Sequence, residues 1–246
     1  MQDPVLILGA TGAIGGAIAK RLAVKSPIVV HGRDEGKLAL LKNKLSNSSK
    51  YKIDSYSADL KRSDEVQLLF DNISVKYKKL SGIVFSIAQP FSNKLTHNIP
   101  WKDFSEQIDS QLKSLHFVIQ NVLPLLKGRK YGARLVVLST EFLIGVPPIK
   151  TASYVSAKAA LTAYSRVLSQ EWLKYNIRVH ILAPGMVKSS LTDHMPDRYL
   201  DQVVESMPEK QLTTVDDVAD MAEFLMTPKA DTMYGSIIHA SRAERR

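Results

Sequence analysis

Tyr154 and Lys158 are four residues apart in a stretch with the apolar spacing of a helix. An α-helix turns once in about 3.6 residues, so the phenol and the ammonium would lie on one face. A nearby cation stabilises phenolate and lowers the tyrosine pKa from about 10, which suits a general acid or base. In a lysine-rich chain with nine tyrosines, the same spacing also arises by chance as an ordinary contact on a helix surface.

The position of this pair in the chain favours a chemical role over a chance contact. An apolar run ends at Leu138, and two hydroxyl residues, Ser139 and Thr140, follow it shortly before the predicted helix. If the run is a strand, these hydroxyls lie at the carboxyl edge of a sheet, where open α/β folds bind ligands.

A glycine-rich turn, Gly9-Ala10-Thr11-Gly12-Ala13-Ile14-Gly15-Gly16, joins the first apolar run to the first helical stretch. Glycine permits a sharp turn, lets backbone N–H groups approach a pyrophosphate, and lets a helix pack closely on a strand. The helix N-terminus would then face the anion. A tight turn that binds no ligand would look similar, but the position of this one, at residue 9 of a chain with alternating strands and helices, predicts dinucleotide binding.

The end of the second apolar run, His31-Gly32-Arg33-Asp34, bears on the choice of dinucleotide. A carboxylate in this region bonds the ribose 2′-hydroxyl of NAD(H), whereas a 2′-phosphate calls for an arginine. Arg33 offers a planar cationic fork, and Gly32 leaves space beside it. We therefore predict NADP(H) in preference to NAD(H). The alternative is that Arg33 pairs with Asp34 or Glu35.

Short apolar runs alternate with longer stretches of helical spacing along the whole chain, and no linker, repeat or low-complexity tract interrupts them. The predicted strands are 5–8, 27–31, 51–57, 82–87, 134–138, 177–183 and 236–239, and the predicted helices are 13–24, 34–46, 62–78, 100–127, 151–175 and 214–227. Apolar strands joined by helical crossovers imply a parallel sheet covered on both faces. The sequence predicts a single doubly wound α/β domain over residues 1–246, with a seven-stranded parallel sheet.

Residues 186–213 break this alternation, because the segment has no strand and mixes prolines and methionines with charged residues. It is predicted to be a substrate lid over the carboxyl edge of the sheet. The competing interpretation is a surface excursion of two short helices.

The composition narrows the class of protein. The chain has 33 Lys and Arg against 24 Asp and Glu, which gives a formal charge of +9. The basic residues are dispersed along the sequence, so they predict solvated faces or the binding of a small anionic ligand, and not nucleic-acid binding. No apolar run reaches the roughly 18 residues of a membrane span. With no cysteine and no histidine pair at helical metal-site spacing, we expect a soluble cytoplasmic protein without a metal centre.

Together, these motifs resemble the short-chain dehydrogenase/reductase family over essentially the full chain. The resemblance rests on the glycine turn, the Tyr154–Lys158 pair and four further segments: Ala58-Asp59-Leu60, Ile177-Arg178-Val179 leading to Ala183-Pro184-Gly185, Val215-Asp216-Asp217-Val218-Ala219, and Tyr234-Gly235-Ser236-Ile237-Ile238. It implies that Tyr154 exchanges a proton with the substrate, and that Lys158 holds the cofactor ribose and lowers the tyrosine pKa. It also implies cofactor contacts from Asp59 and Leu60 near the adenine, from Ala88 after the fourth strand, and from Pro184 and Gly185 beside the nicotinamide.

Some positions depart from the family pattern. Counting back thirteen residues from Tyr154 reaches Glu141, a poor oxyanion stabiliser unless protonated, whereas aligning the strand end reaches Thr140. We assign the family's catalytic hydroxyl to Thr140, with Ser139 as the alternative. Gln111 stands where the family often carries an asparagine. The chain also has Ala240-Ser241-Arg242 in place of a glycine pair.

The resemblance implies an NADPH-dependent oxidoreductase that reduces a ketone, reversibly with a secondary alcohol. A 3-oxoacyl-type carbonyl, free or carrier-bound, is a substrate subclass that the resemblance implies. The alternative is a catalytically silent NADP(H)-binding regulatory or scaffold protein. A nucleotide-sugar epimerase is disfavoured, because only about sixty residues follow Gly185. A homodimer or homotetramer is expected, with helices 100–127 and 151–175 at the interface.

Overall fold

The computed structural model describes residues 2–189, 191–192 and 197–242. All seven strands join one parallel sheet in the order β3-β2-β1-β4-β5-β6-β7. Their bounds are β1 (Val5–Leu8), β2 (Ile28–Gly32), β3 (Ile53–Ser57), β4 (Gly82–Phe85), β5 (Ala133–Leu138), β6 (Ile177–Pro184) and β7 (Ile237–Ala240). The predicted doubly wound, seven-stranded parallel sheet is confirmed, and the strand bounds differ from the predicted ones by up to two residues.

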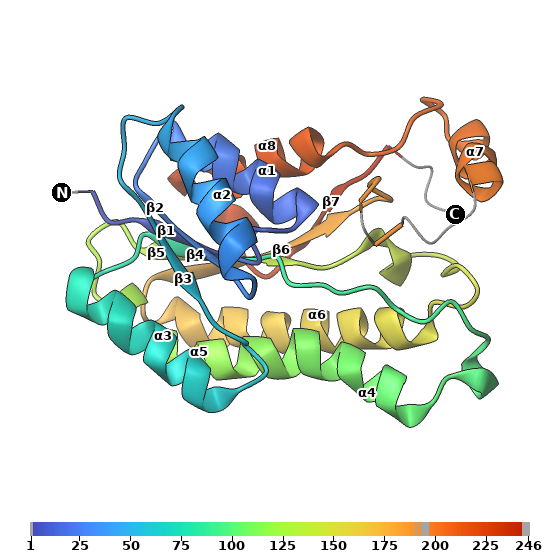
Figure 1. Cartoon of the computed structure of the whole chain (residues 1–246), viewed down its shortest axis with the longest axis horizontal. Helices are drawn as coiled ribbons and strands as arrows, with labels where there is room; N and C mark the ends of the chain where they lie inside the picture. Colours follow the sequence, from blue (N-terminus) through green and yellow to red (C-terminus); the bar gives the residue numbers. More distant parts are fainter. Residues whose placement is uncertain (1, 190, 193–196, 243–246) are drawn as a thin grey trace.

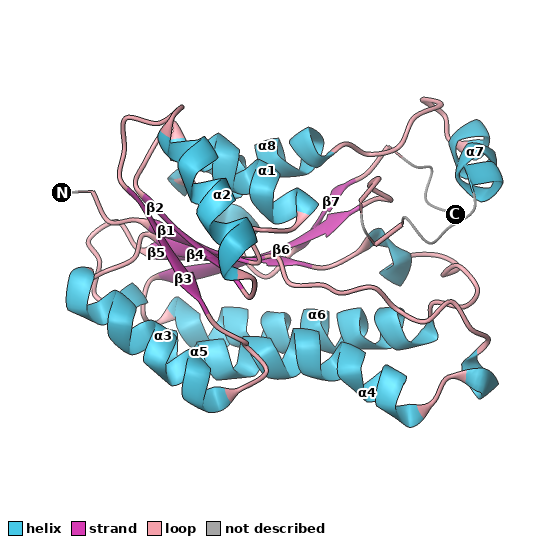
Figure 2. Cartoon of the chain, in the orientation of Figure 1, coloured by secondary structure: helices cyan, strands magenta, loops and turns pink. Residues whose placement is uncertain are grey.

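Helices cover both faces of the sheet (Figures 1 and 2). On one face lie α1 (Ala13–Ala23), α2 (Glu35–Ser46) and α8 (Val215–Leu225); on the other lie α3 (Ser63–Lys76), α4 (Trp101–Ile108), α5 (Ser114–Leu126) and α6 (Ala152–Leu173). The remaining helix, α7 (Asp197–Ser206), lies at one end of the molecule. Most crossovers return the chain to a neighbouring parallel strand, but the β3-to-β4 crossover passes β2 and β1 and joins the sheet on the other side of β1. The helix of this crossover, α3, and the helices α4 to α6 after it lie on the face opposite α1 and α2, so both faces of the sheet are covered (Figure 1).

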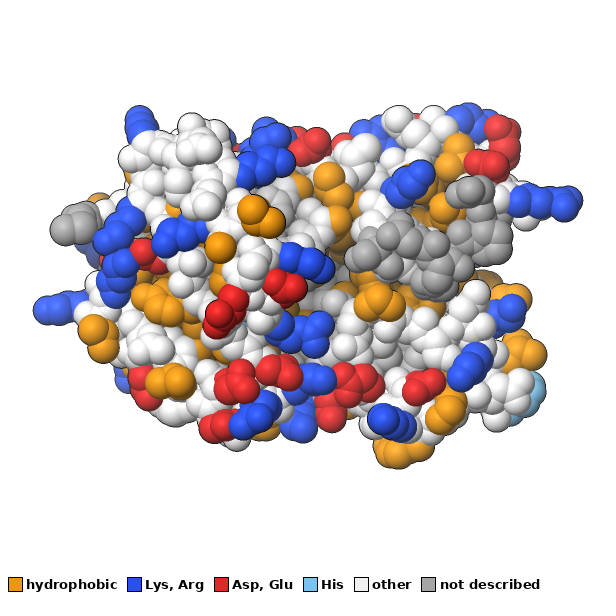
Figure 3. All heavy atoms as spheres, in the orientation of Figure 1, with side chains coloured by type: hydrophobic (Ala, Val, Ile, Leu, Met, Phe, Trp, Pro, Cys, Tyr) orange, Lys and Arg blue, Asp and Glu red, His pale blue; other side chains and the backbone are white. Residues whose placement is uncertain are grey.

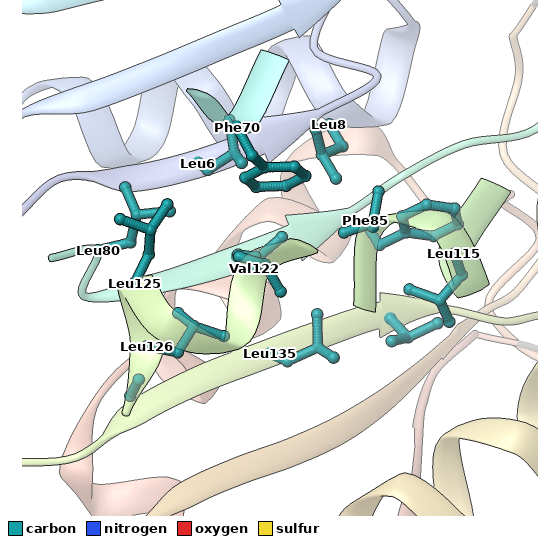
Figure 4. Packing of buried hydrophobic residues seen from close by; sticks show 14 of the residues in the cluster. Leu6, Leu8, Phe70, Leu80, Phe85, Leu115, Val122, Leu125, Leu126 and Leu135 are labelled. Carbon is teal, nitrogen blue, oxygen red and sulfur yellow. The ribbon is translucent and has the colours of Figure 1, made fainter. Parts of the chain in front are cut away.

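Because successive side chains of a strand point to opposite faces, the side chains of one strand pack into two separate hydrophobic cores, one on each face of the sheet. In β1, Leu6 and Leu8 pack under α3 and α5, whereas Val5 and Ile7 pack under α1 and α8. Figure 4 shows the first of these cores, in which Phe70 and Phe85 meet leucines from β1, β5 and α5. The continuous apolar strands of the sequence are therefore explained by burial on both faces.

The predicted helix 100–127 consists of α4, a π-helical turn at Asp109–Lys113, and α5. A π turn inserts one extra residue per turn and re-aims the side chains that follow it. Residue spacing over so short a stretch does not distinguish it from an α-helix, so the pattern predicted a single helix. Gln111 lies within this turn and is fully buried.

The segment 186–213 is closed at its base by a parallel bridge between Val187 and Thr213, and its described part contains one helix, α7. Residues 190 and 193–196 of the predicted lid lie outside the described residues. Among the helices of the described chain, none is both long and apolar enough to cross a bilayer.

Charges of both signs are interspersed on the face drawn in Figure 3. Two lysines near the end of α3 have local structural partners: Lys76 pairs with Asp54, and Lys79 donates to the carbonyl oxygens of Pro124 and Lys127. Lys76 therefore connects α3 to β3, and Lys79 connects the chain after α3 to the end of α5.

Candidate active site

The glycine turn lies at the carboxyl edge of β1, where the strand order reverses between β1 and β4. Gly9 has a φ of +84°, and a Cβ added there would come within 2.5 Å of the Ser86 carbonyl oxygen. A Cβ added to Gly15 would come within 2.2 Å of the Gly9 carbonyl oxygen. The turn therefore accepts only glycine at both positions. It leaves α1 with no side-chain cap at Gly12, so its first N–H groups remain available to an anion.

Two adjoining cavities open on either side of this turn, and they share Gly12, Ser86, Ile87, Ala88 and Pro90. The first, which we call the Arg33 cavity, is also lined by Gly9, Thr11, His31, Gly32, Arg33, Asp59 and Leu60. The second, the Tyr154 cavity, is also lined by Ile14, Gly15, Ser139, Thr140, Tyr154, Lys158, Pro184 and Gly185. Every residue predicted from the sequence to bind cofactor or to act in catalysis therefore lies on one of two connected cavities.

The two carboxylates that follow Arg33 in the chain, those of Asp34 and Glu35, are engaged elsewhere. Asp34 accepts a hydrogen bond from the backbone N–H of Lys37, 2.9 Å away, and so caps α2. Glu35 accepts from the Ser57 hydroxyl at 3.0 Å. Among the described residues, neither lies within ion-pair distance of Arg33, so the guanidinium is available to a ligand.

Sequence reasoning missed the part that His31 plays in shaping the Arg33 cavity. The side chain is buried, and its Nε2 donates to the carbonyl oxygen of Ala58 at 3.0 Å. Burial lowers the pKa of His31 to about 4, so the ring is neutral at physiological pH. It ties the end of β2 to the segment that carries Asp59 and Leu60.

In the Tyr154 cavity, the ammonium of Lys158 reaches the end of β5. Its Nζ donates to the carbonyl oxygen of Leu138 at 2.6 Å and lies 5.9 Å from the centroid of the Tyr154 ring. Both side chains are buried, at 2% and 9% exposure respectively. The lysine therefore anchors α6 to the strand that carries the two candidate hydroxyls.

The two hydroxyls after β5 have different partners. Ser139 shares a 2.6 Å hydrogen bond with the hydroxyl of Thr162 on α6. The Thr140 hydroxyl lowers the pKa of the Tyr154 phenol, and its oxygen accepts from the N–H of Phe142 at 3.3 Å. Of the two, Thr140 is the hydroxyl coupled to the tyrosine.

The expected acidification of the phenol is wrong for the protein alone. Burial raises the pKa of Tyr154 to about 12, against a smaller opposing effect of the Thr140 side chain. Burial also lowers the pKa of Lys158 to about 7. Desolvation disfavours the charged form of each group and is the main cause of both shifts. Residue spacing does not reveal burial, so the sequence could not predict this direction.

Aromatic side chains enclose Tyr154. The Phe91 ring stacks on the phenol with centroids 5.0 Å apart and planes at 25°, and Phe142 meets it edge-on at 6.4 Å. Both phenylalanines line the Tyr154 cavity together with Met186, Val187 and Leu191. Sequence reasoning did not single out these residues. The positions of the two phenylalanines, three residues after Ala88 and two residues after Thr140, were the available signal.

Gln111 and Glu141, the two unusual residues near the site, both have partners. The Gln111 amide donates to Oε1 of Gln107 at 3.0 Å. The Glu141 carboxylate accepts from the N–H of Met186 at 3.2 Å and from the Ser241 hydroxyl. Glu141 is thus bound to the segment after β6.

The sequence is similar to a known family and to curated proteins over most of its length. The family described as enoyl-(acyl carrier protein) reductase matches residues 9–242. A relative, 3-oxoacyl-[acyl-carrier-protein] reductase FabG of Rickettsia felis, is 30% identical over 237 residues, covering 96% of this chain and 94% of that protein. Nodulation protein G of Rhizobium meliloti is 27% identical, with the same coverage of both chains.

Solved structures share the fold at lower identity. YwfH, an NADPH-dependent reductase involved in bacilysin biosynthesis, superposes with a TM-score of 0.87 at 18% identity and covers 98% of both chains. An NAD⁺-bound xylitol dehydrogenase superposes with a TM-score of 0.89 at 19% identity, also over 98% of both chains. The chain belongs to the short-chain dehydrogenase/reductase family, whose members are nicotinamide-dependent oxidoreductases acting on carbonyl and alcohol groups.

Proposed function

We propose that this protein is an NADPH-dependent reductase of ketones, reversible with secondary alcohols, and that Tyr154 donates the proton. The observation that carries the proposal is the coupling of Tyr154 to Thr140 inside a cavity that adjoins the glycine turn. A buried phenol beside a hydroxyl can protonate and hold one oxygen atom at the same time.

The residues present suit a dinucleotide. Gly9 and Gly15 leave a cradle that a Cβ would fill, and the uncapped start of α1 offers N–H groups to a pyrophosphate. When bound, the nicotinamide cofactor supplies the hydride. Pro184 and Gly185 would hold its reactive end in the Tyr154 cavity.

Side chains of the protein then donate the proton and bind the carbonyl oxygen. With its pKa at about 12, the Tyr154 phenol is fully protonated at neutral pH and can donate to an oxygen that gains negative charge. Thr140 donates to the same oxygen and holds it in line. Lys158, near its midpoint of charge at pH 7, stabilises the phenolate left behind and would grip the cofactor ribose.

The preference for NADPH is supported by Arg33, whose neighbouring carboxylates are used elsewhere. Lys37 lines the same cavity and adds positive charge, which suits a 2′-phosphate, whereas the Lys61 ammonium in that cavity is paired with Glu106 at 2.6 Å.

The apolar lining of the Tyr154 cavity supports an uncharged, hydrophobic carbonyl substrate. The names of the FabG relatives support a 3-oxoacyl thioester, free or bound to a carrier protein. The segment 186–213 would cover such a substrate, since Met186, Val187 and Leu191 already line the cavity.

We expect a homodimer or homotetramer in the cytoplasm. The absence of cysteine suits a reducing compartment. Trp101 of α4 is 74% exposed and Val167 of α6 is 60% exposed, and burial of such side chains would stabilise an interface on these helices. Light scattering that gave the mass of a monomer would contradict the assembly.

The test of function is NADPH oxidation against a panel of ketones that includes 3-oxoacyl thioesters, with wild type and Tyr154→Phe side by side. Turnover that is lost in the variant supports the proposal. Tight NADPH binding without turnover on any carbonyl, and a biological effect that Tyr154→Phe leaves intact, would favour the silent NADP(H)-binding alternative.

A further inference from the structure

The residues after β7 meet the active site through Glu141, the residue that follows Thr140. One carboxylate oxygen of Glu141 accepts from the N–H of Met186, and the other accepts from the hydroxyl of Ser241. Met186 lines the Tyr154 cavity. A single carboxylate therefore joins three segments: the end of β5 with its catalytic hydroxyl, the wall of the cavity after β6, and the chain after β7.

The packing around Gly185 shows how closely these segments approach one another. A Cβ added to Gly185 would come within 2.6 Å of the Thr213 hydroxyl, 2.8 Å of the Ser241 hydroxyl and 3.2 Å of Glu141 Oε1. The backbone N–H of Gly185 also donates to the carbonyl oxygen of Ala240 at 2.9 Å. The cavity wall is thus held against the C-terminal segment by both backbone and side-chain contacts.

Arg242 extends the same junction to the far end of the segment 186–213. Its guanidinium forms a two-point contact with the Asp217 carboxylate, at 2.9 and 2.7 Å, and donates to Glu209 at 2.6 Å. Asp217 in turn closes a capping box with Thr214 at the start of α8. The start of the segment 186–213 is therefore connected to Ser241 through Glu141, and the end of the segment is bound to Arg242 through Glu209.

We propose that Glu141, Ser241 and Arg242, which we call the C-terminal clasp, are positioning residues that hold the Gly185–Val187 wall in register with Thr140 and Tyr154. None of the three is proposed to touch the reacting atoms. The clasp gives Glu141 a role in place of the oxyanion contact that its position in the sequence suggested. Its kinetic consequences rest on the proposed reductase function, whereas its structural consequences do not.

The structural test is amide hydrogen exchange at Met186, measured by mass spectrometry on the full chain with and without NADPH. Glu141→Ala removes the acceptor of the Met186 N–H, and we expect exchange there to speed up about tenfold, the equivalent of one hydrogen bond to a charged group. Glu141→Gln keeps one oxygen as acceptor and should restore most of the protection. Asp71→Ala, a surface carboxylate on α3, is the control and should leave the exchange of Met186 unchanged.

The contacts of Arg242 with Glu209 and Asp217 are tested by the same hydrogen-exchange measurement. Arg242→Ala should speed up exchange over residues 209–217 and have a smaller effect at Met186. Unchanged exchange at Met186 in Glu141→Ala, or unchanged exchange over 209–217 in Arg242→Ala, would overturn the clasp whether or not the protein proves to be a reductase.

The kinetic test is a double-mutant cycle between Glu141→Ala and Ser241→Ala. Both changes break the contact between Glu141 and Ser241, so we expect each to lower kcat/KM for the ketone about five- to tenfold. The kcat/KM of the double variant should be no lower than that of the less active single variant. Effects that multiply, or turnover within twofold of wild type in both single variants, would contradict the positioning role. If the wild type reduces no ketone, the proposed function fails, and hydrogen exchange alone decides on the clasp.

Discussion

Lys158 donates its hydrogen bond to the carbonyl oxygen of Leu138, 2.6 Å away, and not to the phenol of Tyr154. The lysine thus connects α6 to the end of β5, two residues before Thr140. Because its ammonium is buried, the lysine also destabilises the folded protein whenever it is charged. Replacing Lys158 should therefore change both the activity and the stability of the protein.

Lys158→Met should abolish turnover and stabilise the protein by about 1–3 kcal/mol at pH 6, because the cost of burying an ammonium exceeds the loss of one hydrogen bond. Below about pH 7 the folded wild type carries the charge and is least stable. Between about pH 7 and pH 10.5, Lys158 keeps its proton in the unfolded chain but has lost it in the folded chain. The free energy of unfolding of the wild type therefore rises with pH over this range.

The advantage of Lys158→Met should therefore shrink as the pH increases from 6 to 9. Urea unfolding of both proteins across this range measures the difference. An advantage that is independent of pH would mean that the buried lysine does not titrate in the folded state.

Thr140→Val should lower kcat about 100-fold, because it removes the hydroxyl that holds the carbonyl oxygen while conserving shape. Thr140→Ser keeps the hydroxyl and should retain most of the activity. Ser139→Ala should instead act mainly on stability, through the lost bond to Thr162. Steady-state kinetics and thermal unfolding of the three variants separate these roles, and a greater loss of kcat in Ser139→Ala than in Thr140→Val would reverse the assignment.

Arg33→Ala should raise KM for NADPH about tenfold or more and leave KM for NADH nearly unchanged, because only the 2′-phosphate requires the guanidinium. Arg62→Ala is a matched control: Arg62 is exposed and pairs with Asp64 on α3. Equal effects of Arg33→Ala on both cofactors would contradict NADP(H) selectivity.

Much of this structure could be predicted because its determinants are local in the chain. The turn from Gly9 to Gly15, the helix that carries Tyr154 and Lys158, and the alternation of strands and helices are all visible as spacing. Parallel topology then brings the strand ends together, which is how distant residues such as Arg33, Thr140 and Gly185 come to line adjoining cavities.

The features that could not be predicted depend on contacts between remote residues or on burial. Glu141 and Ser241 are 100 residues apart and share no pattern. The π turn around Gln111 has the same polar and apolar spacing as an α-helix. The directions of the pKa shifts of Tyr154 and Lys158 follow from desolvation, which only the packed structure reveals.

The most direct measurement is single-turnover reduction of a ketone by the NADPH-loaded protein, comparing wild type with Tyr154→Phe. The phenylalanine keeps the ring packing with Phe91 and Phe142 and removes only the proton donor. We predict unchanged NADPH affinity and a rate at least about 100-fold lower, since general acid catalysis contributes on this scale. A Tyr154→Phe variant that binds NADPH and reduces the ketone at the wild-type rate would contradict proton donation by this tyrosine.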